Sequence, residues 1–175
     1  ALTGIANRRC FDEVSRKEWD RGLRDQQPLT LLLLDVDSFK KFNDFYGHGE
    51  GDNCLHNIGQ ALKASVMRTS DVVARYGGEE FVILLPNPKV GGGIKVAERV
   101  SSFVDGLAMQ HEYSDAASHV TISIGITSMT ADHEHSITDM LKQADIALYQ
   151  AKANGRHQYV VYSDITTSPT ASALL

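Results

Sequence analysis

The sequence predicts one mixed α/β domain of the ferredoxin-like kind, in which helices cover a mainly antiparallel sheet of about five strands. Three observations support this prediction. Apolar runs of strand length alternate with segments whose apolar residues recur at helical spacing. A Gly-Gly pair joins two of these runs as a hairpin. The 175 residues, of which 42% are hydrophobic and 22% charged, suffice for one domain with one core.

The chain starts with a helix and a buried strand. Residues 7–24 are predicted to be helical, although their surface is highly charged. Pro28 separates this helix from the apolar run 29–34, which is typical of a strand buried on both faces. Asp35 follows at the carboxyl end of the strand, where α/β sheets commonly bind their ligands.

A loop and a second helix come next. Residues 43–52 are polar and interrupted by glycines, so we expect a loop there. Apolar residues then recur at helical spacing, which predicts a helix over residues 51–67. Asp52, near the start of that helix, is either a capping or first-turn acid or a binding residue.

A hairpin is predicted over residues 71–85. Gly77 and Gly78 separate its two apolar runs, and only glycine takes a positive φ in a tight turn without steric cost. Glu79 and Glu80 follow directly. Crowded like charges repel unless a cation lies beside them, and a divalent metal serves this purpose well. Taken alone, the Gly-Gly pattern favours a solvated turn with two exposed glutamates.

The rest of the chain alternates between helix and strand after the breaks at Pro86 and Pro88. The predicted helices are 90–109 and 137–153, the latter ended by Gly155, and the predicted strands are 120–127 and 158–162. We expect the domain to span residues 1–162 and residues 163–175 to form a disordered tail.

Composition excludes several functional classes. No run is long and apolar enough to cross a bilayer, and no signal peptide is present. Cys10 and Cys54 are too few and too far apart for a disulfide framework, which fits a cytoplasmic protein. The net charge of −5 argues against a nucleic-acid partner but not against a mononucleotide site. We expect no direct membrane insertion, although the full protein could be tethered through an N-terminal region.

The seven histidines lack the helical i, i+4 spacing of a zinc site. His133 and His135 lie in a polar stretch, and His111 and His119 flank another. We therefore interpret the histidines as surface residues.

The sequence contains a series of short motifs: Leu2–Arg9, Asp35–Lys40, Asn43, Gly47-His48, Gly51-Asp52, Gly77–Phe81 and Ala151–Arg156. Together these motifs resemble the GGDEF domain family of diguanylate cyclases. They follow one another in the family's order, and the resemblance extends to about Tyr162. It implies a sheet like the nucleotidyl-cyclase and polymerase palm. The implied activity is the condensation of two GTP into cyclic di-GMP and two pyrophosphates.

The resemblance also implies a metal site. Asp35 and Glu79 would bind Mg²⁺ or Mn²⁺, with the carbonyl of Val36 as a further ligand, and Glu80 would join a second ion. Glu79 would also activate the attacking 3′-hydroxyl. Metal ions that bridge phosphates polarise phosphorus and neutralise the leaving group. Many family members carry aspartate at the position of Glu79, and glutamate keeps the carboxylate while adding one methylene of reach.

Cationic groups would complement the β- and γ-phosphates of GTP. On the family's pattern these groups are Lys40, Lys152 and Arg156. The backbone N–H groups of Ser38, Phe39 and Lys40 would form an anion-binding nest. Each side chain also has a simpler interpretation as a solvated residue at a helix end.

The resemblance assigns guanine recognition to Asn43 and Asp52. A carboxylate accepts from the N1 and N2 donors of guanine, whereas adenine would place an acceptor against it. Asp52 therefore favours GTP as the substrate. Leu55 either packs on the guanine face or belongs to the core of its own helix.

A second binding site is expected just before the hairpin. Arg68 and Asp71 match the family's inhibitory R-x-x-D motif in spacing from Gly77. The motif implies binding of the product cyclic di-GMP and feedback inhibition, with Arg99 as a further arginine. An isolated Arg and Asp at this spacing would ordinarily be a surface pair.

Turnover would require a homodimer, because each domain holds one GTP and two domains must face each other across a two-fold axis. The chain begins inside the family's opening motif, so we expect a sensory or dimerising segment to precede it in the full protein. The alternatives are a catalytically silent receptor of cyclic di-GMP, a cyclase with another product and a purely structural dimerisation domain.

Overall fold

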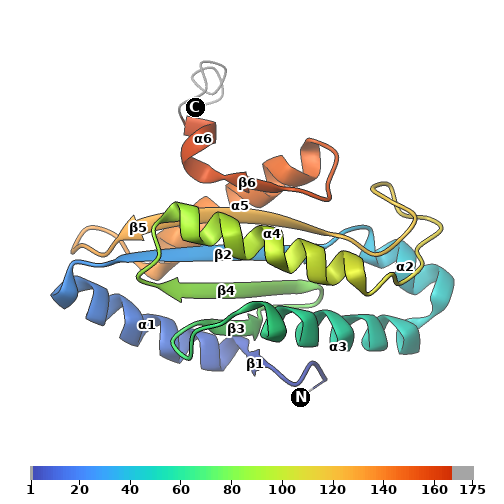
Figure 1. Ribbon diagram of the computed structural model, residues 1–175, viewed down its shortest axis with the longest axis horizontal. Helices are drawn as coiled ribbons and strands as arrows, with labels where there is room; N and C mark the ends of the chain where they lie inside the picture. The colour runs from blue at the N-terminus through green and yellow to red at the C-terminus, as the bar shows by residue number, and fades with distance from the viewer. Residues whose placement is uncertain (1, 167–175) are drawn as a thin grey trace.

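The computed structural model describes residues 2–166 of the chain. Within them a six-stranded sheet has the order β1-β3-β4-β2-β5-β6 (Figure 1). The strands are β1 (Ala6–Asn7), β2 (Pro28–Val36), β3 (Val72–Arg75), β4 (Glu80–Pro86), β5 (Ile122–Thr130) and β6 (Tyr159–Val161). The inner strands pair antiparallel, and β1 and β6 pair parallel at the two edges. The predicted fold class is confirmed, with one short strand more than expected.

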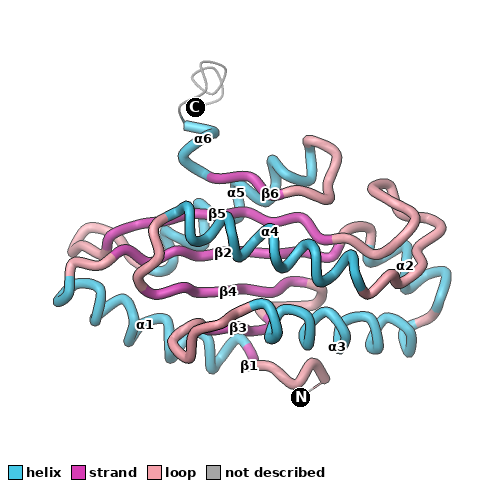
Figure 2. Tube along the Cα trace, in the orientation of Figure 1, coloured by secondary structure: helices cyan, strands magenta, loops and turns pink. Residues whose placement is uncertain are grey.

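Helices cover both faces of the sheet (Figure 2). They are α1 (Arg8–Asp25), α2 (Phe39–Tyr46), α3 (His48–Ser65), α4 (Val90–Gly106), α5 (Ile137–Ala153) and α6 (Tyr162–Thr166). One buried cluster joins the sheet to α3 and α4, and the other joins it to α1 and α5. The molecule is therefore a three-layer sandwich with a core on each side of the sheet.

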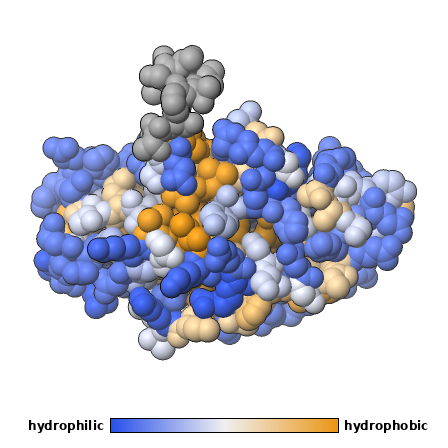
Figure 3. All heavy atoms as spheres, turned by 45° about the horizontal axis from the view of Figure 1, so that its top comes forward, coloured by the Kyte–Doolittle hydropathy of each residue, from blue (hydrophilic) through white to orange (hydrophobic). Residues whose placement is uncertain are grey.

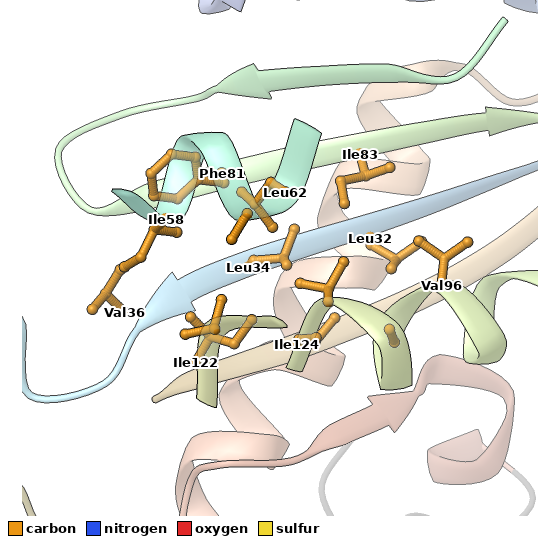
Figure 4. Close-up of a cluster of buried hydrophobic side chains, with 14 of the residues drawn as sticks. Leu32, Leu34, Val36, Ile58, Leu62, Phe81, Ile83, Val96, Ile122 and Ile124 are labelled. Atoms are coloured by element: carbon orange, nitrogen blue, oxygen red, sulfur yellow. The ribbon is translucent and has the colours of Figure 1, made fainter. Parts of the chain in front are cut away.

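Strand β2 contributes side chains to both cores, which explains its unbroken apolar sequence. Leu32 and Leu34 belong to the cluster under α3 and α4, which Figure 4 shows in close-up. Leu31 and Leu33 belong to the cluster under α1 and α5. Because side chains alternate along a strand, Asp35 points to the same face as Leu33, toward α5.

The expected loop over residues 43–52 is wrong. Helix α2 ends at Tyr46 and α3 begins at His48, so only Gly47 separates them. Phe39 and Phe42 are buried three residues apart, and the Phe42 and Tyr46 rings lie 4.7 Å apart. This apolar stripe stabilises a helix despite the polar residues between its members.

The hairpin forms where predicted, but the reason given for its glycines is wrong. Neither Gly77 nor Gly78 has a positive φ among the described residues. The turn is closed by a hydrogen bond of 2.8 Å from the Tyr76 N–H to the Glu80 carbonyl. A Cβ at Gly77 would lie 3.2 Å from Glu80 Oε2, so the close carboxylate favours glycine there.

The surface is mostly hydrophilic on the face in Figure 3, with apolar side chains gathered beside the C-terminal end. No helix within residues 2–166 is long and apolar enough to cross a membrane. Helix α6 extends to Thr166, where a disordered tail was expected from residue 163, and residues 167–175 lie outside the described part of the chain.

Candidate functional site

The end of β2 meets the turn of the β3–β4 hairpin. Asp35 lies opposite Glu80 in the β2–β4 register, and the Val36 N–H donates to the Glu79 carbonyl at 3.3 Å. Asp35 is only 8% exposed, whereas Glu79 and Glu80 are half-buried. Acidic residues 44 and 45 positions apart in the sequence are thus brought together.

Helix α5 adds a cation to this acidic cluster. Lys152 Nζ lies 2.9 Å from Asp35 Oδ1. The helix can lie this close because Gly125 of β5 has no side chain: a Cβ there would be 2.0 Å from the Ala144 carbonyl oxygen. Burial raises the pKa of Asp35 to about 6, Lys152 opposes this rise, and the charges of Glu79 and Glu80 add to it.

This donor set fits a divalent cation. Mg²⁺ and Mn²⁺ prefer carboxylate and carbonyl oxygens, which Asp35, Glu79 and Glu80 supply. Burial is the main cause of the raised pKa of Asp35, and a bound cation would relieve the smaller contribution from the charges of Glu79 and Glu80.

The turn between β2 and α2 is the segment where a phosphate-binding nest was expected. Ser38 is left-handed, with φ 55°, and its side chain does not cap the helix. The first helical bond runs from the Phe42 N–H to the Ser38 carbonyl, so the N–H groups of Phe39 and Lys40 lie at the open end of α2. Lys40 is exposed there, and Phe39 is buried.

Arg156 also lies near this turn. It follows α5 with a left-handed φ of 64°, and its N–H donates to the Ala151 carbonyl. A hydrogen bond from Lys41 lowers the pKa of Asp115, and the charge of Arg156 contributes to that lowering. Asp115 in turn accepts from Ser38 Oγ at 3.3 Å. Lys40 thus lies in the first turn of α2, Lys152 contacts Asp35 just before this turn, and the charge of Arg156 acts on an acid that Ser38 contacts.

Sequence reasoning missed the part played by Asp37, which is 1% exposed. Its carboxylate accepts from Thr121 Oγ1 at 2.8 Å, Ser123 Oγ at 2.6 Å and the His157 N–H at 3.1 Å. Asp37 thus ties the end of β2 to β5 and to the loop after α5. The sequence could have indicated this role. Because side chains alternate along a strand, an acid two residues beyond Asp35 points to the same buried face.

The two residues expected to read guanine lie on α2 and α3. Asn43 Oδ1 is buried and has no hydrogen-bond partner among the described residues. A Cβ at Gly51 would lie 1.8 Å from this oxygen, so Asn43 can occupy its place only beside a glycine. Asp52, the next residue, is exposed. Leu55 is 2% exposed and belongs to the core cluster under α3 and α4.

The structure also brings together the three residues expected at the second site. The Arg68 N–H donates to Asp71 Oδ2 at 3.3 Å, and Arg99 Nε donates to the Ser65 carbonyl at 2.5 Å. Burial raises the pKa of Asp71, while Arg68 and Arg99 lower it. Asp71 Oδ1 is buried without a partner in the described part of the chain. The length of β3 separates this cluster from the hairpin turn.

The interpretation of all the histidines as surface residues is wrong for His111, which is fully buried. An isolated bridge between Gln110 and His119 folds the intervening segment back over α2. The His111 ring packs edge-on against Phe42, and its Nε2 lies 3.1 Å from the Ser38 carbonyl oxygen.

Comparison with known proteins shows the family of this chain. Residues 1–158 match the family described as "Diguanylate cyclase, GGDEF domain". This chain belongs to the GGDEF domain family. The GGDEF domain is 39% identical over 159 residues to the response regulator PleD of Caulobacter vibrioides, covering 91% of this chain and 35% of that protein. It is 40% identical over 133 residues to diguanylate cyclase A of Treponema denticola, covering 76% and 35%. The GGDEF domain thus spans 35% of the length of these curated relatives.

Solved GGDEF structures share the fold. The GGDEF domain of DgcB from Caulobacter crescentus, in complex with c-di-GMP, has 26% identity and a TM-score of 0.83, covering 93% of this chain and 94% of that chain. The active GGEEF domain of a diguanylate cyclase from Vibrio cholerae has 31% identity and a TM-score of 0.77, covering 90% and 97%. Diguanylate cyclase SiaD from Pseudomonas aeruginosa, in complex with its activator SiaC, has 38% identity and a TM-score of 0.82, covering 91% and 60%.

Proposed function

We propose that this GGDEF domain condenses two GTP into cyclic di-GMP with release of two pyrophosphates. The observation that carries the proposal is the contact of Asp35 with Lys152, beside Glu79 and Glu80 at the hairpin. A buried carboxylate with a raised pKa, next to further acids and a lysine, is typical of a site that handles a metal-bound phosphate.

Asp35, Glu79 and the Val36 carbonyl would hold Mg²⁺ or Mn²⁺, with Glu80 on a second ion. When bound, the ion polarises the α-phosphate and neutralises the charge of the pyrophosphate. Glu79, on the open side of the cluster, accepts the proton of the attacking 3′-hydroxyl. Lys152 leaves Asp35 for the phosphates as the site fills, because both partners compete for the same ammonium.

Lys40 and Arg156 bind the β- and γ-phosphates from either side of the turn that Ser38 begins. The N–H groups of Ser38, Phe39 and Lys40 point their positive ends at the same anion. Together these groups position the α-phosphorus rather than react with it, which is the larger part of catalysis in phosphoryl transfer.

Asn43 and Asp52 select guanine. The buried, unpaired Oδ1 of Asn43 costs about 1–3 kcal/mol in the free protein, and a base N–H would satisfy it. Asp52 accepts from the Watson–Crick donors of guanine and would be left unpaired by adenine. Leu55 supports this pair from the core beneath it.

Arg68, Asp71 and Arg99 form a site for the product, which inhibits turnover. The guanidinium groups bind a phosphate or guanine, and Asp71 accepts from the N–H edge of the base. The unpaired Oδ1 of Asp71 supports this assignment, because it offers an acceptor that no described group uses.

Purified protein with GTP and Mg²⁺ should form cyclic di-GMP and pyrophosphate. Glu79→Gln keeps the size of the side chain and removes its charge, so turnover should fall roughly a hundredfold or more. Glu134→Gln, at an exposed loop position, is the matched control and should turn over like wild type. Equal rates for the two variants would overturn the proposal.

The second candidate is a catalytically silent receptor of cyclic di-GMP. It is favoured by the cluster of Arg68 and Asp71, which is separate from the Asp35 cluster. Binding of the cyclic dinucleotide without any turnover of GTP, at any protein concentration, would select this alternative.

A further inference from the structure

Three potential metal ligands from distant parts of the sequence meet outside the proposed catalytic site. Asp105 lies near the end of α4, His119 lies on the isolated bridge before β5, and His157 follows α5. His119 Nε2 is 3.2 Å from Asp105 Oδ1, and His157 Nε2 is 3.0 Å from both oxygens of that carboxylate. One ligand atom from each residue lies within 4.8 Å of the other two.

These separations match those between ligands of a zinc ion. With Zn–N and Zn–O bonds of about 2.0–2.2 Å, neighbouring ligands of a tetrahedral site are about 3.4 Å apart. The two His–Asp distances are within a few tenths of an ångström of that value. Two imidazoles and a carboxylate are also a ligand set that zinc commonly takes, with a solvent molecule in the fourth place.

Each ligand is held by its own backbone contact. His119 is fixed by the bridge to Gln110, and Asp105 belongs to a regular helix. The His157 N–H donates to Asp37 Oδ2 at 3.1 Å. Arg156 and His157 are both left-handed, with φ of 64° and 49°, an arrangement that side chains other than glycine rarely adopt. This turn directs the His157 ring toward α4.

The cluster is accessible from solvent. About a third of each side chain is exposed: 36% for Asp105, 31% for His119 and 33% for His157. An open cavity of about 500 Å³ adjoins it, lined by Asp105 and His157 together with residues of α4 and β6. An ion can therefore reach the ligands without any opening of the core.

We propose that Asp105, His119 and His157 bind Zn²⁺ as a second, structural or regulatory metal site of this domain. The ion would replace the protons that the two Nε2 atoms share with the carboxylate. Bound zinc would fix the turn of Arg156 and His157 against α4. Any consequence for turnover rests on the proposed phosphate-binding function of Arg156, whereas zinc binding itself does not.

The test is a calorimetric titration of the purified protein with Zn²⁺ in excess Mg²⁺, with Co²⁺ as a spectroscopic probe. Wild type should bind one ion at this site and give the visible absorption of cobalt bound to imidazole. His119→Ala and His157→Ala should each weaken binding about tenfold or more. Asp105→Asn, nearly unchanged in shape, should do the same, and serves if an alanine variant does not fold.

Two controls separate this site from others. His135 lies 2.9 Å from Asp132 Oδ2 but belongs to no group of three potential metal ligands in the part of the chain described, so His135→Ala should bind Zn²⁺ like wild type. Glu79→Gln should retain the cobalt signal, even if it loses all turnover. The proposal is overturned if wild type binds no zinc, if Asp105→Asn binds as tightly as wild type, or if the signal disappears in Glu79→Gln.

Discussion

Lys152 Nζ and Asp35 Oδ1 lie 2.9 Å apart, although 117 positions separate the two residues. Burial raises the pKa of Asp35 to about 6 despite this contact, and the neighbouring glutamates contribute to the rise. In the free domain, the ammonium group of Lys152 is thus the nearest cation to the buried carboxylate of Asp35 and offsets its negative charge. In the proposed mechanism, ligand binding replaces it with another cation.

The burial of Asp35 predicts how stability depends on pH in the presence of a chelator. Because the pKa of Asp35 rises from 3.8 to about 6 on folding, its ionisation costs stability as the pH increases through that window. Asp35→Asn removes this cost. The free energy of unfolding of the variant relative to wild type should therefore increase by up to about 3 kcal/mol between about pH 4 and about pH 8. Urea unfolding at both pH values measures the change, and a constant difference would contradict the prediction.

Gly51→Ala tests the close approach of Asn43. The added Cβ would lie 1.8 Å from Asn43 Oδ1, so the amide must move and GTP affinity should fall at least about tenfold. Gly49→Ala is the matched control, since its Cβ meets no described atom within 4 Å. The control should bind GTP normally and be at least as stable as wild type, because alanine is the better helix former. Equal GTP affinity in the two variants would argue against a role for Asn43.

Asp37→Ala should reduce the stability of the domain. The substitution leaves Thr121 Oγ1, Ser123 Oγ and the His157 N–H without their acceptor. We expect a loss of roughly 2–4 kcal/mol in the free energy of unfolding. Denaturant titration checks this, with exposed Asp20→Ala as the control expected to stay within about 0.5 kcal/mol of wild type.

Arg68→Ala should relieve inhibition by cyclic di-GMP and leave the initial rate of GTP turnover intact. The guanidinium of Arg68 is exposed beside Asp71, at the opposite end of β3 from the hairpin. Rates measured with increasing added product distinguish the two effects. Lys63→Ala, at an exposed position on α3, removes a similar charge and should remain inhibited. Unchanged inhibition in Arg68→Ala would contradict the assignment of Arg68 to a product-binding site.

Turnover per molecule should rise with protein concentration. Each domain is proposed to hold one GTP, so that two domains must meet before the 3′-hydroxyls and α-phosphates can react. The initial rate at saturating GTP should therefore grow faster than linearly with protein at low concentration. A strictly linear dependence, with a monomer in analytical ultracentrifugation, would contradict the need for a dimer.

Much of the fold could be predicted from local patterns. The unbroken apolar run predicted β2 as a strand buried on both faces, and helical spacing gave the bounds of α5 at Ile137 and Ala153. Helix α2 was missed because polar residues around Asn43 concealed the spacing of Phe39 and Phe42. Glycine at position 47 was taken as evidence for a loop, whereas it only separates two helices.

The meeting of Asp35 with the hairpin glutamates could be inferred, since both lie at the ends of strands that had to pair. The burial of His111 and the meeting of Asp105, His119 and His157 could not. They depend on how the segment between α4 and β5 folds back over α2, and no periodicity in the sequence specifies that path.

The burial of β2 on both faces affects how the two main acids can respond to a ligand. Its backbone amides are shielded by two cores and paired with strands on both sides, so they should exchange with deuterium more slowly than those of the hairpin turn. We therefore expect Asp35 to stay in place when a ligand binds. Glu79 lies on a turn at the surface, and we expect its side chain to move. Aspartate and glutamate at that turn differ in side-chain length, and the turn can accommodate this difference without moving the central strand.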